Sequence, residues 1–168
     1  MYETAVDGGV GLVATYGLVV LFAVFVLEGA LVGKLIPTRT LFVATVLAVG
    51  SDAFGLASVA AVAVVGATLG QLVLFGMVRR TDVTPESLPG VSVGSENGRL
   101  RGWFDRWGMV AIALSNTLPV ARGSLTVPAA MSDGNTLRFS ASSMLGSSVY
   151  AGGLVAVGAG LDTVIGIL

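Results

Sequence analysis

Five long stretches of this 168-residue chain carry no charged side chain, and they limit its fold more than any other feature. They are residues 8–27, 40–51, 53–78, 107–121 and 139–161. A helix needs about 20 apolar residues to cross the hydrocarbon core of a bilayer, and 8–27, 53–78 and 139–161 reach that length. Only 11% of the residues are charged, against about 25% in soluble domains. The sequence therefore predicts an all-α, multi-pass integral membrane protein of the cell membrane.

The composition also excludes several classes of function. The chain has no cysteine and no histidine, which excludes disulfides, Cys/His metal sites and the usual proton carrier at neutral pH. No pair of acids falls at membrane depth, so we expect neither an enzyme nor a cofactor. The net charge of −1 gives no support for nucleic-acid binding. The N-terminus, MYETAVDGG, lacks the basic region of a secretory signal, so we expect the first apolar stretch to be retained.

A polar region at 79–106 divides one domain, 1–168, into two similar halves, about 8–78 and 107–165. The region holds five arginines, which favours a cytoplasmic position. Its last part, RLRGWFDRW (99–107), mixes arginines with Trp103, Phe104 and Trp107 and is typical of a short interfacial helix with aromatic anchors. We expect a repeat on each side of this region.

Each half has the same order of parts. An apolar stretch leads to a polar break, GALVGKLIPTR (29–39) or SNTLPVARGS (115–124), and then to a short apolar stretch. Ser51-Asp52 or Ser132-Asp133 follows as a candidate helix N-cap, and a long helix comes next, the second starting near Phe139. Irregular backbone at membrane depth must be buried in protein or line a polar cavity. We therefore expect an inverted repeat of a re-entrant helical hairpin plus a transmembrane helix, with the two hairpin tips meeting near the midplane. The alternative is that 8–27 spans alone, which gives five crossings.

Both long helices carry rows of small side chains. Ala63, Gly66, Ala67 and Gly70 share one face of the first, and Ser143, Ser147 and Ala151 share a face of the second. Small residues let helix backbones approach closely in membranes, so these faces are expected to pack against other helices. A homo-oligomer is left open.

Ionisable side chains at membrane depth are costly and indicate function by default. Glu28 closes an uncharged run. Arg122 lies in the second break, three residues after Pro119. One interpretation is a buried salt bridge that locks the two breaks together. The other is a site for an anionic group, because guanidinium binds phosphate in a bidentate manner and free N–H groups after Pro119 would add donors. Glu28 is then the best-placed proton carrier.

The same residues resemble the DedA family, also called the SNARE-associated or VTT-domain family. FAVFVLEGALVGKLIPTRTLFVATVLAVG (22–50) fits the first part of the family pattern, GQLVLFGMVRR (70–80) the second, and FDRWGMVAIALSNTLPVARGSLTVPAAM (104–131) the third. The resemblance covers roughly residues 10–160. It implies a transporter that moves polyprenyl-phosphate carriers or phospholipids between leaflets, in some members with dependence on the proton motive force.

This chain departs from the family pattern at several charged positions. The second family acid falls on Arg39, the first family arginine on Asn116, and the acid of a Gly-Asp pair on Gln71. A late tryptophan position matches Tyr150. The changes at Arg39 and Asn116 look like a compensating exchange that keeps the charge of the tips balanced. If coupling operates, Glu28 must then carry it almost alone.

The sequence and the resemblance thus predict a flippase for an anionic, phosphate-bearing lipid, polyprenyl phosphate, with proton or sodium coupling left open. The candidate substrate-binding residues are Arg122, Arg39, Asn116 and Ser115; the candidate coupling residues are Glu28 and Asp52; Pro37 and Pro119 are expected to shape the tips. Helix capping is the other interpretation of Asp52. An unselective phospholipid scramblase and a non-transporting membrane scaffold are the alternative functions.

Overall fold

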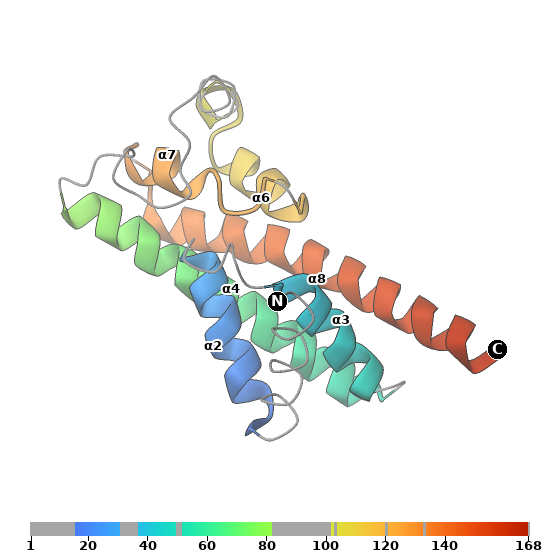
Figure 1. The fold of residues 1–168 in the computed structure, drawn as a ribbon. Helices are drawn as coiled ribbons and strands as arrows, with labels where there is room; N and C mark the ends of the chain where they lie inside the picture. The colour runs from blue at the N-terminus through green and yellow to red at the C-terminus, as the bar shows by residue number, and fades with distance from the viewer. Residues whose placement is uncertain are drawn as a thin grey trace.

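The computed structural model describes residues 16–30, 37–49, 52–81, 102, 104–119, 121–132 and 134–167. These residues form helices and turns, with no strand among them. The helices are α2 (Leu18–Gly29), α3 (Thr38–Val49), α4 (Ala53–Arg80), α6 (Met109–Thr117), α7 (Thr126–Ala130) and α8 (Thr136–Ile167), shown in Figure 1. The predicted all-α class is confirmed for the part of the chain that the structure describes.

Two of these helices, α4 and α8, are long and apolar enough to cross a membrane. α4 has 28 residues and α8 has 32, so both exceed the length of about 20 that a crossing needs. α2 and α3 have 12 residues each, and α6 and α7 have 9 and 5. The short helices therefore come in two pairs, and each pair precedes one long helix, which is the predicted order of parts. Residues 8–15 of the first apolar stretch lie outside the described residues.

Helix capping explains where the long helices begin. Asp52 accepts a hydrogen bond from the Gly55 amide at 2.7 Å and caps α4 as predicted. The corresponding prediction for α8 is wrong, because α8 begins at Thr136 rather than near Phe139. The side chain of Asn135 accepts from the Leu137 amide at 2.8 Å, so Asn135 stands in the N-cap position.

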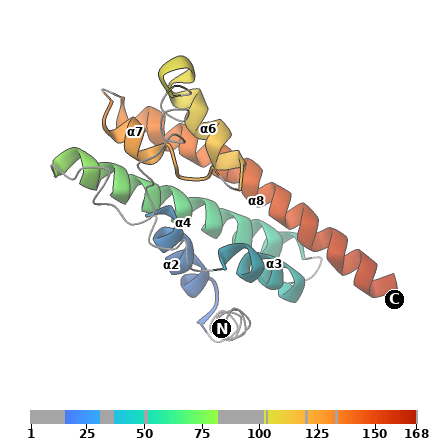
Figure 2. The ribbon, with the colours of Figure 1, turned by 45° about the horizontal axis from the view of Figure 1, so that its top comes forward.

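α4 and α8 lie side by side and antiparallel, with the two pairs of short helices on opposite sides of them (Figures 1 and 2). α2 packs along α4 and α6 along α8, so each first short helix contacts the long helix of its own half. The second short helices reach the other half: α3 contacts α8 as well as α4, and α7 contacts α4. The two halves therefore pack together in part because the second short helix of each contacts the long helix of the other.

Glycines bring the short and long helices into close contact. A Cβ on Gly70 would overlap the carbonyl oxygen of Val26, and a Cβ on Gly146 would overlap that of Ala113. The first contact joins α4 to α2 and the second joins α8 to α6, so both halves use a glycine at the same kind of contact. The predicted packing role of the small-residue face on α4 is confirmed at Gly70.

The apolar core has two parts, one at each end of the α4–α8 pair. In one part Phe25 packs edge-on against Phe42, with ring centroids 5.9 Å apart. In the other Phe75 stacks on Phe139, with centroids 4.4 Å apart. Between the two parts, α4 and α8 bury polar side chains, which are Thr68, Gln71, Ser143 and Ser147. This polar band lies where the breaks of the two halves approach.

The predicted interfacial helix is only partly described. Residues 104–107 are helical, while residues 99–101 and Trp103 lie outside the described residues. Trp107 is exposed, and its role as an interfacial anchor stays a prediction. Phe104 is buried in the core beside Phe75, so its predicted role as an interfacial anchor is wrong.

Candidate functional site

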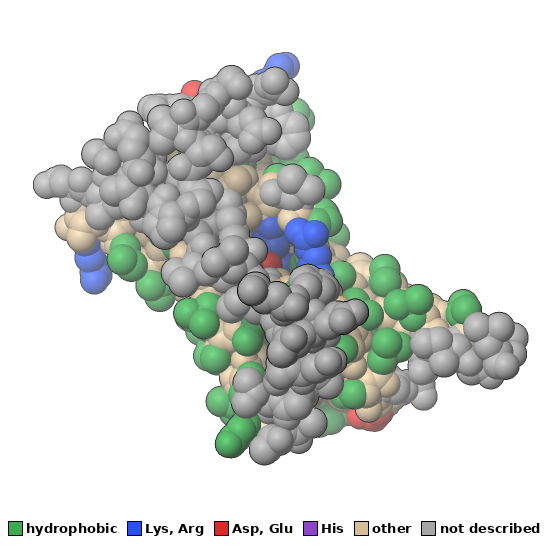
Figure 3. Space-filling view, viewed as in Figure 1, with side chains coloured by type: hydrophobic (Ala, Val, Ile, Leu, Met, Phe, Trp, Pro, Cys, Tyr) green, Lys and Arg blue, Asp and Glu red, His purple; other side chains and the backbone are tan. Residues whose placement is uncertain are grey.

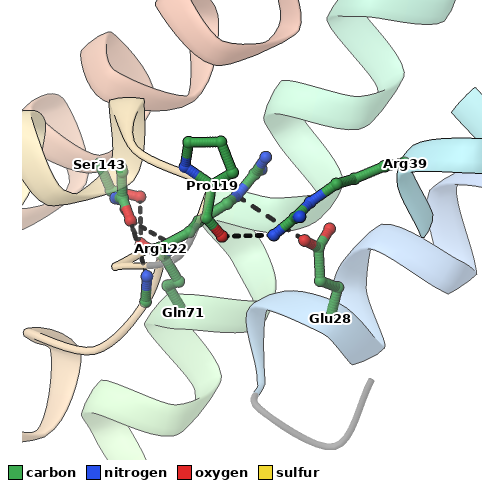
Figure 4. A network of polar contacts seen from close by, with 8 residues as sticks. Glu28, Arg39, Gln71, Pro119, Arg122 and Ser143 are labelled. Atoms are coloured by element: carbon green, nitrogen blue, oxygen red, sulfur yellow. Dashed lines mark hydrogen bonds and ion pairs between the residues drawn. The ribbon is translucent and has the colours of Figure 1, made fainter. Parts of the chain in front are cut away.

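Three charged side chains in or beside the two breaks meet at the middle of the molecule. Glu28 comes from the last turn of α2, Arg39 from the first turn of α3, and Arg122 from the turn between α6 and α7 (Figure 4). Arg122 Nε lies 3.9 Å from Glu28 Oε1, and the two side chains are only 7% and 18% exposed. Arg39 is exposed, and its Nη2 donates to the carbonyl oxygen of Pro119. The two breaks are thus joined by an ion pair and a hydrogen bond.

Aromatic rings hold the guanidinium of Arg122. Its Cζ lies 4.2 Å from the ring centroid of Tyr150 and 5.9 Å from that of Phe25. Arginine stacks on aromatic faces through cation–π attraction, which strengthens when the group is desolvated. Rings from α8 and α2 therefore pack against a guanidinium that the α6–α7 turn supplies.

The ion pair does not use all the hydrogen-bonding groups of its members. Arg122 Nη1 and Glu28 Oε2 are both buried and have no hydrogen-bond partner. A separation of 3.9 Å between Nε and Oε1 also exceeds a normal hydrogen-bond length. Buried polar groups of native proteins usually have partners. The pair is therefore loose, and one buried donor and one buried acceptor of it lack partners.

The turn that carries Arg122 is shaped by Gly123 and Asn116. Gly123 has φ +73°, a conformation that strongly favours glycine, and its amide donates to Asn116 Oδ1 at 3.0 Å. The amides of Ser124 and Thr126 donate to carbonyls within the turn. The expectation of free backbone N–H groups after Pro119 is therefore wrong at these three positions, and the donors for an anion are side chains.

Asn116 also forms a buried pair with Gln71, which sequence reasoning did not find. Gln71 Nε2 donates to Asn116 Oδ1 at 3.0 Å, and Asn116 Nδ2 donates back to Gln71 Oε1 at 2.9 Å. Ser143 Oγ donates to the same Gln71 oxygen at 2.6 Å. The hydrogen-bond partner of Asn116 is thus Gln71, and the compensation of charge between Arg39 and Asn116 stays a prediction. Both members of the pair are neutral amides, and the pair joins α6 to α4.

The other candidates have their own local contacts. Ser115 is buried, and its hydroxyl donates to the carbonyl of Ile112 within α6 at 3.0 Å. Pro37 directly precedes α3, and its carbonyl accepts from the Leu41 amide at 3.1 Å. Proline is tolerated at the start of a helix because no hydrogen bond from its nitrogen is needed there. Asp52 is exposed. It follows the last turn of α3, whereas Arg39 lies in the first turn, and α3 is about 18 Å long. The structure gives Asp52 the capping role and places it away from the charged cluster. Lys34 lies outside the described residues.

The charge of the cluster is positive, because two arginines face one glutamate. Figure 3 shows cationic and acidic atoms together in a recess at the narrow middle of the molecule. No group of three or more acidic side chains that could hold a metal occurs in the described ranges. The arrangement is suited to an anion that offers several acceptor oxygens to guanidinium groups.

Comparison with known proteins gives one partial likeness. The chain is 30% identical over 70 residues to undecaprenyl phosphate transporter A of Staphylococcus aureus, a match that covers 42% of this chain and 34% of that protein. The matched part thus spans about a third of the relative's length. No family model matches the chain, and no solved structure matches it. A relative named as a transporter and two apolar helices together support a membrane location.

Proposed function

We propose that this chain is a DedA-like transporter that moves a phosphate-bearing lipid, a polyprenyl phosphate, between the leaflets of a membrane. The observation that carries the proposal is the cluster of Glu28, Arg39 and Arg122. It combines a net positive charge with a buried guanidinium nitrogen that lacks a partner. The partial likeness to a transporter of undecaprenyl phosphate supports the same class of substrate.

In the proposed topology, α2–α3 and α6–α7 are re-entrant hairpins, and α4 and α8 cross the bilayer. A helix of 12 residues is about 18 Å long and cannot cross a hydrocarbon core of about 30 Å. The antiparallel long helices and the reciprocal crossing of α3 and α7 support two repeats of opposite orientation. The charged cluster lies where the hairpin tips would meet, near the midplane, where inverted-repeat transporters bind their substrates.

In the proposed mechanism, Arg122 and Arg39 bind the phosphate through charge-assisted hydrogen bonds. Glu28 competes with the phosphate for Arg122, so it must give up the ion pair when the lipid enters and can re-form it when the lipid leaves. Uptake of a proton or a sodium ion by Glu28 would couple this exchange to an ion gradient. Asn116 then supports the Arg122 turn by accepting from the Gly123 amide, and the Ser115 hydroxyl stays bonded within α6, so neither contacts the lipid.

Reconstitution in liposomes with a labelled polyprenyl phosphate tests the proposal. Wild-type protein should transfer the lipid between leaflets, and Arg122→Ala should abolish most of the transfer. Arg138→Ala is the matched control, because Arg138 is an exposed arginine at the start of α8. Unchanged transfer by Arg122→Ala would remove the proposed site.

The ion pair between Glu28 and Arg122 also favours a second function, a non-transporting scaffold in which the pair only joins the two halves. The charge swap Glu28→Arg with Arg122→Glu separates the two functions. A scaffold should keep its fold and cellular role after the swap, whereas a phosphate site should lose its ligand. A scramblase is distinguished by equal transfer of zwitterionic and anionic lipids.

A further inference from the structure

Tyr150 is a buried polar side chain that the proposed mechanism does not yet use. It is 6% exposed, and its hydroxyl has no hydrogen-bond partner. On the same helix, the buried Ser143 hydroxyl is satisfied by Gln71, whereas that of the buried Ser147 also lacks a partner. Burying a hydroxyl without a partner costs free energy. The orphaned hydroxyl of Tyr150 therefore indicates a ligand that supplies the missing partner.

The position of Tyr150 identifies what this ligand touches. Its ring lies against the Arg122 guanidinium, with 4.2 Å between Cζ and the ring centroid. Arg122 Nη1 and Glu28 Oε2 are the other unpartnered atoms of this cluster. α8, the α6–α7 turn and α2 thus bring together two donors and one acceptor that all lack partners. An anion bound by Arg122 is in reach of the Tyr150 hydroxyl, because the ring packs directly on the guanidinium.

We propose that Tyr150 is a further phosphate-binding residue, and that Tyr150, Arg122 and Glu28 together select a phosphate monoester over a diester. This rests on the proposed function, in which Arg122 binds the lipid phosphate. A tyrosine hydroxyl can donate to a phosphate oxygen, and a guanidinium can donate to a second one. Glu28 Oε2 lacks a donor, and a ligand with a P–OH group supplies one.

The chemistry of the two esters explains the selection. The second pKa of a phosphate monoester is about 6, so a monoester near neutral pH can keep one P–OH group and donate it to a carboxylate. A diester carries the same single negative charge as the monoester monoanion but has no hydroxyl, so its charged oxygens would face Glu28 without a hydrogen bond to the carboxylate. The site therefore accepts the terminal phosphate of a lipid monophosphate and rejects the phosphodiester of ordinary phospholipids.

Titration calorimetry of the purified chain in detergent tests this inference with two probes that share one alkyl chain. These probes are dodecyl phosphate, a monoester, and methyl dodecyl phosphate, a diester. Wild-type protein should bind the monoester more tightly. Tyr150→Phe should weaken monoester binding by about tenfold or more, the value of a lost hydrogen bond to a charged group. Glu28→Gln should reduce the difference in affinity between the monoester and the diester, because the amide of glutamine can donate a hydrogen bond to an oxygen of the diester.

Two controls separate binding from stability. Tyr16→Phe makes the same change at a tyrosine that is 64% exposed and should leave binding unchanged. The thermal unfolding midpoint of ligand-free Tyr150→Phe should stay equal to that of the wild type or rise, because the substitution removes an unsatisfied buried group. A lower midpoint together with unchanged binding would assign Tyr150 a structural role and overturn the inference. Equal wild-type affinity for the two esters would overturn it too.

The outcomes also distinguish this inference from the proposed function. If dodecyl phosphate binds in a Tyr150-dependent way but liposomes show no lipid transfer, transport fails and the binding inference stands. If lipid transfer occurs and Tyr150→Phe binds and transfers normally, only the inference fails. Inorganic phosphate is titrated in parallel, and affinity equal to that of dodecyl phosphate would overturn the assignment to a lipid.

Discussion

Replacing Asn116 with leucine should destabilise the protein by about 2 kcal/mol, because it breaks a buried amide pair between α6 and α4. The substitution leaves Gln71 Nε2 and the Gly123 amide without acceptors, since both donate to Asn116 Oδ1. Gln71 Oε1 keeps its bond from Ser143. An orphaned buried donor costs about 1–3 kcal/mol, and we take the lower end because hydrogen bonds between membrane helices are individually weak.

The reciprocal substitution, Gln71→Leu, should cost about the same. It orphans Asn116 Nδ2 and the hydroxyl of Ser143, while Asn116 Oδ1 keeps its bond from Gly123. The double variant orphans only the Gly123 amide and the Ser143 hydroxyl. It therefore leaves as many donors unpaired as either single variant, and it should cost about 2 kcal/mol and not about 4 kcal/mol.

Thermal unfolding in detergent micelles, followed by far-UV circular dichroism, measures this coupling. Each single variant and the double variant should lower the midpoint by about 4–8 °C, on the scale expected for a chain of this length. A double variant whose loss equals the two single losses added together would refute the reasoning. It would mean that Gln71 and Asn116 contribute independently and do not form a pair.

Two further predictions use the same unfolding measurement. Gly70→Ala should destabilise the protein strongly, because the added Cβ would overlap the backbone carbonyl of Val26. Gly76→Ala in the same helix is the control: its Cβ meets no atom within 4 Å, so this variant should be neutral or stabilising. Equal effects of the two substitutions would contradict the close contact of α2 with α4. Asp52→Ala should lower the free energy of unfolding by about 1 kcal/mol, because it removes the cap on the Gly55 amide. Asp52→Asn should restore most of that stability. A loss of lipid transfer at unchanged stability would instead favour the coupling role of Asp52.

The long helices could be predicted because their signals are local. An uncharged run of 26 residues, 53–78, with Asp52 before it, determines α4 from composition and one cap. α8 begins at Thr136, three residues earlier than expected. The reason is that Asn135, a polar residue before the apolar run, caps the helix by accepting from the Leu137 amide. Glu28 and Arg122 could also be chosen in advance, since a charge is conspicuous in an apolar chain.

The contacts between helices could not be predicted in the same way. Gln71 and Asn116 are 45 residues apart, and no local pattern indicates that two amides will meet. Tyr150 lies in an apolar stretch where an aromatic residue is ordinary, and only the crossing of α8 with the α6–α7 turn places its ring on Arg122. The missing signal is in each case a tertiary distance, which depends on how the glycine-mediated contacts set the helices against one another.

The pairing of Asn116 with Gln71 changes how the charges of this chain balance. The family resemblance implies an acid at position 71 and an arginine at position 116, and this chain has a neutral amide at both. Because these two residues bond to each other, the two changes compensate locally and leave no unpaired charge behind. The guanidinium of Arg39 donates to a neutral carbonyl, that of Pro119. The added positive charge is therefore not neutralised within the cluster, and it strengthens the attraction of the Arg122 site for an anion.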